Sequence, residues 1–422
     1  MKKINISEVK VGKEVLLKGW VAKTRALGQI RFLLLKDISG SIQITAVKSK
    51  ADKDVFSILD TVTRESVIEI VGKVVSSKQA PGGKEVIPIK VVVLNKAEEL
   101  PIDVSDYSKT ELPKRLDYRF LDLHRTRVQA IFKIQSEIAH SFREYFYKKG
   151  FLEVQLPSII SSSSEGGTEL FPVTYFEKKA YLAQSPQLYK QMLSCSVGNV
   201  FTITPVWRAE KHNTVRHLNE SRQMDIEMAF VGQMEVMKEL ENVVVFIVKQ
   251  ILKNCKEELK LLGVNLKVPK VKYLSYDETV ELLKIKYGED LTPENERKLN
   301  ELFSDTIVFV HSWPVKIKPF YIMPKDENFS SELSEGFDAI YKGLEISSGG
   351  QRIHLPELLK KTLKAKGLDV KNFKSYIDSF RFGAPAHAGW SIGLERLTQL
   401  ITNQKNIREA VLFPRDRDRL TP

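Results

Sequence analysis

Residues 200–230 carry charged side chains at a spacing that can support chemistry. The stretch VFTITPVWRAEKHNTVRHLNESRQMDIEMAF has apolar residues at alternate positions, which is typical of two β-strands around a loop. In the first strand, Arg208 and Glu210 face away from Phe201 and Trp207. We therefore predict a hairpin with an apolar underside and a charged upper side.

The second strand and the loop complete this charged upper side. The polar side chains on one face of the second strand are Gln223, Asp225 and Glu227, whereas Met224, Ile226, Met228 and Phe230 share the other. The loop between the strands carries Lys211, His212, Arg216 and His217. Such a charged surface suits the binding of a polyphosphate beside a small polar molecule. The alternative is a surface hairpin with solvated charges, but a solvated face seldom alternates both signs.

A second cluster lies in GFDAIYKGLEISSGGQRIH, which contains Asp338, Glu345, Ser348 and Arg352. Asp338 and Glu345 are an odd number of residues apart, so they face the same way only if a turn near 342–343 intervenes. Carboxylate and hydroxyl oxygens are hard ligands suited to a Mg²⁺ ion that also binds a nucleotide's phosphates. The alternative is the solvated edge of a hairpin.

The segment GWSIGLERLTQL forms a third cluster around Arg396, in the first turn of a predicted helix. A cation there opposes the helix dipole, and Glu395 offsets only part of the conflict. A bound phosphate would remove it. The alternative is an amphipathic core helix whose arginine reaches solvent.

The elements that must position these groups fall into two domains. Residues 13–98 read as about five short strands with a helix near 51–63, which predicts a closed barrel of the OB type. Within it Phe32 lies among basic residues such as Arg25, which would suit a single-stranded base. An ordinary core phenylalanine is the alternative for Phe32.

The rest of the chain predicts an α+β domain. Residues 101–120 read as a polar hinge, and helical periodicity over 123–149 ends at Gly150. A largely antiparallel sheet flanked by helices is expected across 121–422, after an N-terminal barrel domain over 1–100. Residues 271–310 mix helix and short strands without recognisable chemistry.

Composition limits the class of protein. The chain has 422 residues, 42% hydrophobic and 28% charged, and no apolar run approaches the length of a membrane span. Two cysteines and the absence of a secretory signal predict a reducing, cytoplasmic setting. The net charge of +12 indicates a nucleic-acid partner or, equally, a lysine-rich composition.

Three motifs in order resemble those of class II aminoacyl-tRNA synthetases: FREYFYKKGFLEVQLP, VFTITPVWRAE with RHLNE, and GWSIGLERL. SEGGTELF, QSPQLYKQ, EISSGGQR and the terminus FPRDRDRLTP narrow the resemblance to aspartyl-tRNA synthetases of the archaeal type. It covers nearly the whole chain. The resemblance implies an aspartate–tRNA ligase that makes aspartyl-adenylate from ATP and passes the aspartyl group to tRNA(Asp).

The resemblance assigns roles on the ATP side. Arg208 would hold the α-phosphate and Arg396 the γ-phosphate, with Glu345 as the third catalytic residue. The outer phosphates would contact Arg216 and His217, and Glu210 would contact adenine or the tRNA acceptor end. The Mg²⁺ ligands implied are Asp338, Glu345 and Ser348. Many relatives stack an aromatic on adenine directly after RHxxE; here Ser221 and Arg222 follow, so Arg396 and Arg222 become the expected stacking groups.

On the aspartate side, the family implies Lys190 and Arg352 for the side-chain carboxylate and places Asp225 beneath the pocket. The ammonium end would be bound by Ser164, Glu165 and Gln187, with Ser348 nearby. Asparagine enzymes carry glutamate at the place of Asp225, so Asp225 favours aspartate. Asparagine would leave two buried cations facing a neutral amide, at a cost of about 3–5 kcal/mol, which would make an editing domain unnecessary.

The resemblance also concerns tRNA and assembly. Arg25, Phe32 and Gln43 match anticodon contacts, and Ala22 with Pro81 in KQAPGGKE favours charging of tRNA(Asn) as well. The helix at 127–149, with the strand that ends at Pro157, would form a homodimer interface. The alternatives are an asparaginyl-tRNA synthetase and a non-catalytic RNA-binding paralogue; an asparagine-forming paralogue would lack the barrel.

Overall fold

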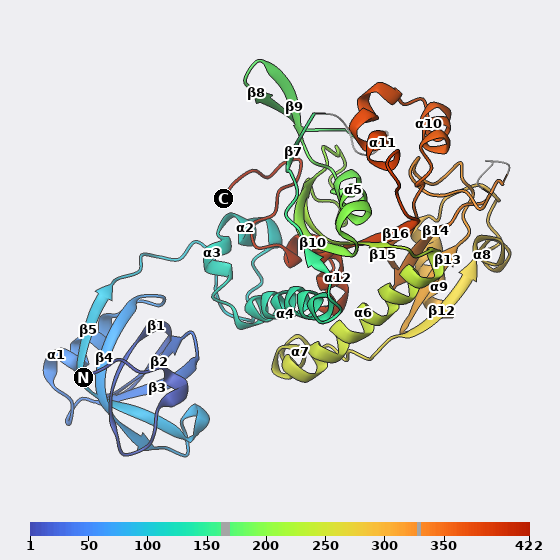
Figure 1. Cartoon of the computed structure of the whole chain (residues 1–422). Helices are drawn as coiled ribbons and strands as arrows, with labels where there is room; N and C mark the ends of the chain where they lie inside the picture. The colour runs from blue at the N-terminus through green and yellow to red at the C-terminus, as the bar shows by residue number, and fades with distance from the viewer. Residues whose placement is uncertain (162–168, 327–330) are drawn as a thin grey trace. The chain divides into compact units, whose positions relative to one another are not determined.

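The computed structural model describes residues 1–161, 169–326 and 331–422. The chain folds as two compact units, Met1–Asp103 and Val104–Pro422 (Figure 1). Within the described residues, none of the helices has both the length and the apolar character needed to cross a bilayer.

The first unit is a closed five-stranded barrel, in the order β1-β2-β3-β5-β4. Alternation places residues such as Leu33, Leu35 and Ile44 in its core. The predicted OB-type barrel is confirmed, including the helix α1 between the third and fourth strands. The bounds are η1 (Ile6–Glu8), β1 (Glu14–Leu27), β2 (Ile30–Asp37), β3 (Gly40–Val47), α1 (Lys53–Thr61), β4 (Val67–Ser76), η2 (Pro81–Gly83) and β5 (Lys84–Asn95).

The second unit is built on an eight-stranded sheet, in the order β12-β13-β14-β15-β16-β11-β10-β6. All neighbours are antiparallel except β12 with β13 and β10 with β6. A separate three-stranded sheet has the order β7-β9-β8. The strands are β6 (Leu152–Glu153), β7 (Ile159–Ile160), β8 (Pro172–Tyr175), β9 (Lys178–Leu182), β10 (Val200–Trp207), β11 (Glu220–Ala229), β12 (Lys270–Ser275), β13 (Thr306–His311), β14 (Gly336–Tyr341), β15 (Leu344–Gln351) and β16 (His387–Gly393).

Helices cover both faces of the large sheet. Phe142, Met224 and Trp390 lie in the core that α4, α6 and α12 form on one face, and α5 packs on the opposite face (Figure 1). The helices are α4 (Thr126–Lys148), α5 (Gln187–Val197), α6 (Gln233–Asn254), α7 (Lys256–Leu262), α8 (Tyr276–Leu283), α9 (Pro293–Leu302), α10 (Pro356–Ala365), η3 (Val370–Phe373), α11 (Lys374–Phe380), α12 (Leu394–Ile401) and η4 (Ile407–Ala410).

Part of the stretch expected to be a hinge is instead folded, as α2 (Leu112–Asp117) and α3 (Arg119–Asp122). Arg119 is fully buried; it donates to Asp122 Oδ2 at 2.6 Å and to the carbonyl of Val411 at 2.9 Å. A guanidinium with five donors can tie a polar segment to a distant one. In α3, at the end of this stretch, a charged side chain therefore serves to pair segments that lie far apart in the sequence.

The hairpin of residues 200–230 forms with the expected faces, except at its end. Phe201, Met224 and Ile226 are buried in the core. Phe230 is 84% exposed and has a φ of +62°, because the chain has already left the strand at Ala229. The prediction that Phe230 shares the apolar underside is wrong for this reason.

Candidate active site

A polar cavity of about 320 Å³ opens over β11, β15 and the start of α12. It gathers side chains from segments that lie far apart in the sequence. Nine of the predicted site residues line it: Gln187, Arg208, Glu210, Arg216, His217, Glu345, Ser348, Arg352 and Arg396. Of the others, Lys190, Asp225 and Asp338 are buried close to these elements without lining the cavity, and Ser164 and Glu165 lie outside the described residues.

The loop between β10 and β11 supplies the cations on one side of the cavity. Arg208 follows the end of β10, and its N–H donates to the carbonyl of Asn219 at 3.0 Å, which fixes where the loop begins. His217 lies 3.5 Å from Glu210 and contacts Thr214 Oγ1 at 2.5 Å. Lys211, in the same loop, is paired with Glu169 and does not line the cavity.

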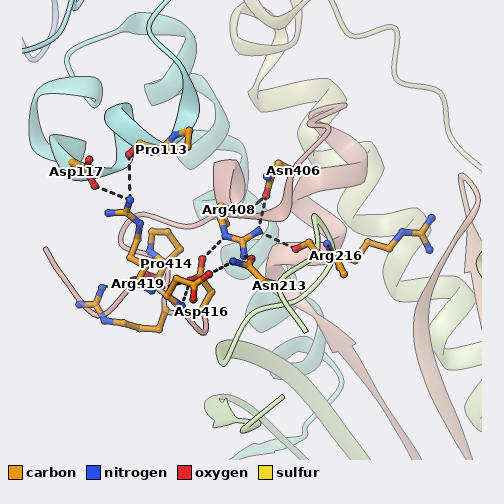
Figure 2. Close-up of polar contacts among 12 residues, drawn as sticks. Pro113, Asp117, Asn213, Arg216, Asn406, Arg408, Pro414, Asp416 and Arg419 are labelled. Carbon is orange, nitrogen blue, oxygen red and sulfur yellow. Dashed lines mark hydrogen bonds and ion pairs between the residues drawn. The ribbon is translucent and has the colours of Figure 1, made fainter. Parts of the chain in front are cut away.

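The C-terminal segment anchors this loop. Figure 2 shows Arg408 among its partners, where it is hydrogen-bonded to Asp416 and Asn213. Its Nη1 also donates to the carbonyl of Thr214 at 2.9 Å. Although burial opposes the effect, the hydrogen bond from Arg408 helps to lower the pKa of Asp416. A second arginine, Arg419, joins this segment to Asp117 Oδ1 at 2.7 Å.

The hairpin of β14 and β15 brings the proposed metal ligands together. A turn at residues 342–343 reverses the chain, as predicted, and Asp338 pairs with Ser348 across the strands. Burial, with the nearby charge of Asp338, raises the pKa of Glu345 to about 7. Two carboxylates that repel each other beside a hydroxyl fit a divalent cation.

Lys318, which the sequence did not reveal as a site residue, occupies part of this acidic cluster. Its Nζ lies 2.5 Å from Asp338 Oδ2, and both side chains are buried. The ammonium also lies 4.3 Å from the centre of the Trp313 ring. No group of three or more His, Cys, Asp or Glu side chains able to hold a metal occurs in the described ranges. Two carboxylates and a hydroxyl would leave the other positions on a Mg²⁺ ion to water and substrate phosphates.

Arg396 and Glu395 begin α12 at the cavity's edge. Arg396 Nη1 donates to the carbonyl of Glu345 at 2.7 Å. Burial raises the pKa of Glu395 to about 7, even though Glu395 Oε2 accepts a hydrogen bond from the Arg222 N–H at 2.9 Å. The arginine predicted to oppose the helix dipole therefore contacts a neighbouring strand.

The interpretation of Arg222 as a second stacking surface needs correction. Ser221 and Gln223 line the cavity, so alternation along β11 directs Arg222 to the other face. There its side chain pairs with Glu220 at 2.9 Å. Arg396 is thus the one of the two expected stacking groups that lines the cavity.

Below the cavity, two buried cations meet two buried carboxylates. Lys190 Nζ lies 2.7 Å from Asp225 Oδ1 and 3.5 Å from Glu227 Oε2. Arg352 contacts Glu227 through Nε at 3.0 Å and Nη2 at 3.4 Å. Asparagine, which was expected to leave two buried cations facing a neutral amide, would meet cations that are each already paired with a carboxylate.

Two features of this floor were not recognised from sequence. Glu227 bridges Lys190 and Arg352, although its place beside Asp225 on the polar face of the strand was a usable signal. Gly389 makes room for it, since an added Cβ there would lie 2.1 Å from Glu227 Oε2. Buried oxygens of Gln223 and Ser347 also border the cavity without a hydrogen-bond partner in the described part of the chain.

In the barrel, the three predicted anticodon contacts share its outer surface. Phe32 pairs with Arg25 across β1 and β2 and with Thr45 across β2 and β3, and Gln43 lies on the same face as Thr45. Phe32 is half-buried and does not belong to the barrel core, which contains its neighbour Leu33. The alternative of an ordinary core phenylalanine is therefore excluded.

The largely antiparallel sheet, with an arginine-lined cavity over β11, β15 and α12, defines a class II aminoacyl-tRNA synthetase. The family model for class II tRNA synthetases (D, K and N) matches residues 111–417, and an OB-fold nucleic-acid-binding domain matches residues 15–94. The chain belongs to this family of class II tRNA synthetases, and it is an ATP-dependent ligase.

The individual proteins similar to this chain include aspartate and asparagine enzymes. An aspartate–tRNA(Asp/Asn) ligase of Methanothermobacter thermautotrophicus is 48% identical over 97% of this chain and 95% of its own. An asparaginyl-tRNA synthetase from Pyrococcus horikoshii, solved with asparaginyl-adenylate, gives a TM-score of 0.93 at 32% identity, with all of both chains covered. An aspartyl-tRNA synthetase from Entamoeba histolytica gives 0.88 at 32% identity, covering 100% of this chain and 93% of its own.

These comparisons confirm the resemblance predicted from the sequence, to aspartyl-tRNA synthetases of the archaeal type. The solved structures include both aspartyl and asparaginyl enzymes at the same identity, so the fold alone does not distinguish the two amino acids. The relative with the higher identity is an aspartate enzyme. The choice between the amino acids therefore rests on sequence similarity and on the side chains of the site.

Proposed function

We propose that this chain is an aspartate–tRNA ligase that charges tRNA(Asp) and also tRNA(Asn). The main support for the proposal is that a site suited to ATP adjoins a site suited to aspartate. A cavity lined by Arg208, Arg216 and Arg396 opens directly beside Arg352, under which lies the paired floor of Lys190 and Asp225. The name of the 48% identical relative supports the same activity and the same pair of tRNAs.

In the first step, the aspartate α-carboxylate attacks the α-phosphorus of ATP, and pyrophosphate leaves. Arg208 would neutralise charge that builds on the α-phosphate, while Arg216, His217 and Arg396 would hold the outer phosphates. Such displacements depend mainly on positioning and electrostatic stabilisation, which a set of fixed cations supplies. In the second step, the 3′-terminal hydroxyl of tRNA attacks the aspartyl carbonyl, and AMP leaves.

For aspartate, we assign the side-chain carboxylate to Arg352 and Lys190. Both residues offer hydrogen-bond donors only, so they suit a carboxylate that only accepts. An asparagine side chain would place its own N–H₂ donors against them. Gln187 lines the cavity beside this floor and would contact the ammonium group, as would Ser164 and Glu165.

We also assign a Mg²⁺ site to Asp338, Glu345 and Ser348. Bound there, the ion would neutralise phosphate charge during adenylate formation. Lys318 holds one oxygen of Asp338, and Glu345 sits on the cavity wall beside Arg396. Lys318 would thus fix one carboxylate of the cluster, and Glu345 would face the phosphates from the cavity wall.

The barrel would bind the anticodon through Arg25, Phe32 and Gln43, and residues 1–100 would act as the anticodon-binding domain. Ala22 lies in a bulge of β1, between the pairs made by Val21 and Lys23. A small side chain there suits relaxed reading of the third anticodon base. Charging of pure tRNA(Asn) transcript at a rate near that of tRNA(Asp) is expected, and a background rate would mean a strict enzyme.

A homodimer is also part of the proposal. β6 is the edge strand of the large sheet, and the nearby Tyr147 and Leu152 are 55% and 52% exposed. Exposed apolar side chains beside an unpaired strand edge are typical of an interface. Light scattering after size-exclusion chromatography should give twice the chain mass of 48.2 kDa, and a mass of one chain would contradict the assignment.

The activity itself is tested by ATP–pyrophosphate exchange with aspartate as the only amino acid. We expect exchange in the cytoplasmic pH range, and its loss in R208A and R396A. A non-catalytic RNA-binding paralogue would give no exchange, and an asparaginyl enzyme would require asparagine. The presence of Arg208, Arg396 and Glu345 in the lining of one cavity argues against the paralogue.

A further inference from the structure

Helix α9 brings a carboxylate to the ATP side of the cavity from a segment whose sequence carries no recognisable motif. Thr292 caps this helix: its Oγ1 accepts from the Asn295 N–H at 3.3 Å, and Asn295 Oδ1 accepts in return from the Thr292 N–H at 2.9 Å. Pro293 occupies the first turn. The helix therefore begins at a fixed point, and Glu296 follows one turn later.

Glu296 makes two contacts with the site. Its Oε2 lies 3.3 Å from Arg216 Nη1, and its Oε1 accepts a hydrogen bond from the Glu345 N–H at 3.3 Å. The residue is only 9% exposed. One carboxylate thus joins the cationic loop to the strand that carries a proposed metal ligand.

The position of the Arg216 side chain depends on this contact, because the other anchor of the loop holds its backbone and not this side chain. Arg408 holds the loop at the carbonyl of Thr214. In Figure 2 the side chain of Arg216 extends away from Arg408 and its partners. Across the described ranges, Glu296 is the only acidic side chain that forms an ion pair with Arg216.

We propose that Glu296 is a positioning residue for ATP, which holds one edge of the Arg216 guanidinium so that its remaining N–H groups face the outer phosphates. A guanidinium has five donors in a fixed plane, and the contact with Glu296 uses one nitrogen. The proposal rests on the assignment of Arg216 to ATP. By its second contact, Glu296 also keeps Glu345 at a set distance from Arg216.

The opposite role would be competition, in which Glu296 withholds Arg216 until ATP displaces it. The two roles predict opposite changes in the affinity for ATP. Loss of the Glu296 charge weakens ATP binding if the residue positions Arg216, and strengthens it if the residue competes with phosphate. Since Arg216 already lines the cavity while it is paired, the geometry favours positioning.

The experiment uses the full chain and measures ATP binding by calorimetry without amino acid. E296Q keeps the acceptor for the Glu345 N–H but removes the charge, and we expect the Kd for ATP to rise about tenfold while the chain stays folded at the assay temperature. E296D should give an intermediate Kd. E294Q, an exposed change on the same helix, is the matched control and should bind ATP as the unmodified chain does.

A double-mutant cycle then separates positioning from a general effect. In an R216A background, adding E296Q should change the Kd for ATP by less than twofold, because there is no guanidinium left to position. An unchanged or lower Kd in E296Q, or the same tenfold loss in both backgrounds, would overturn the proposal. ATP binding needs no aspartate, so this result stands apart from the exchange assay that tests the proposed function.

Discussion

Arg352 and Glu227 form a buried ion pair with two contacts, at 3.0 Å and 3.4 Å, beneath the proposed aspartate site. Lys190 and Asp225 form a second pair beside it. The floor is therefore balanced in charge before any ligand binds. We therefore assign the selection of aspartate to the direction of hydrogen bonds, because these four side chains carry no excess of positive charge.

The first prediction concerns the stability of this floor. E227Q would leave Arg352 buried with one anion fewer, and removal of one member of a buried pair costs about 3–5 kcal/mol. We expect a loss of this order in urea unfolding of the chain. E220Q removes a partly exposed partner of Arg222 on the same strand and should cost less than about 1 kcal/mol. Equal effects of the two changes would contradict the assigned role of Glu227.

The second prediction concerns Lys318. Its ammonium repels a divalent ion at Asp338, so K318M should tighten Mg²⁺ binding by about tenfold. With ATP present to supply phosphate ligands, the increase in melting temperature on addition of MgCl₂ should therefore appear at lower concentration than in the unmodified chain. K316M, an exposed change two residues away, should behave as the unmodified chain does. Weaker Mg²⁺ stabilisation in K318M would place the ion elsewhere.

Much of the site follows from local patterns. Arg208, Glu345 and Arg396 belong to strands or a helix start whose spacing and motifs are visible in the chain. Glu296 and Lys318 could not be found in this way, because each becomes a site residue only when α9 and the segment after β13 pack against β14 and β15. The fold was similarly predictable where alternation was regular, and less so in the helices α2 and α3.

A third prediction follows from the raised pKa of Glu395. Its pKa of about 7, against an ordinary 4.5, means that the folded state favours the protonated form. The associated stability is full below about pH 4.5 and is lost as the pH rises through 7. E395Q imitates the protonated form, so its gain in stability over the unmodified chain should grow by about 1 kcal/mol as the pH rises from 6 to 8. A difference that is constant with pH would show that Glu395 is ionised throughout.

The fourth prediction concerns the barrel. Stacking of one base on an aromatic side chain contributes about 1–3 kcal/mol, so F32A should weaken tRNA binding by roughly tenfold or more. ATP–pyrophosphate exchange needs no anticodon and should be unchanged. I38A alters an apolar residue of the same barrel that is 85% exposed and serves as the control. If F32A bound tRNA as tightly as I38A, Phe32 would not be a stacking surface.

We propose that the floor of Lys190, Asp225, Glu227 and Arg352 selects aspartate. The most direct measurement offers aspartate and asparagine together, at equal concentration with ATP and tRNA(Asp), and identifies the amino acid esterified to the tRNA. We predict aspartyl-tRNA with asparaginyl-tRNA at background. Asparaginyl-tRNA as the main product would contradict the claim.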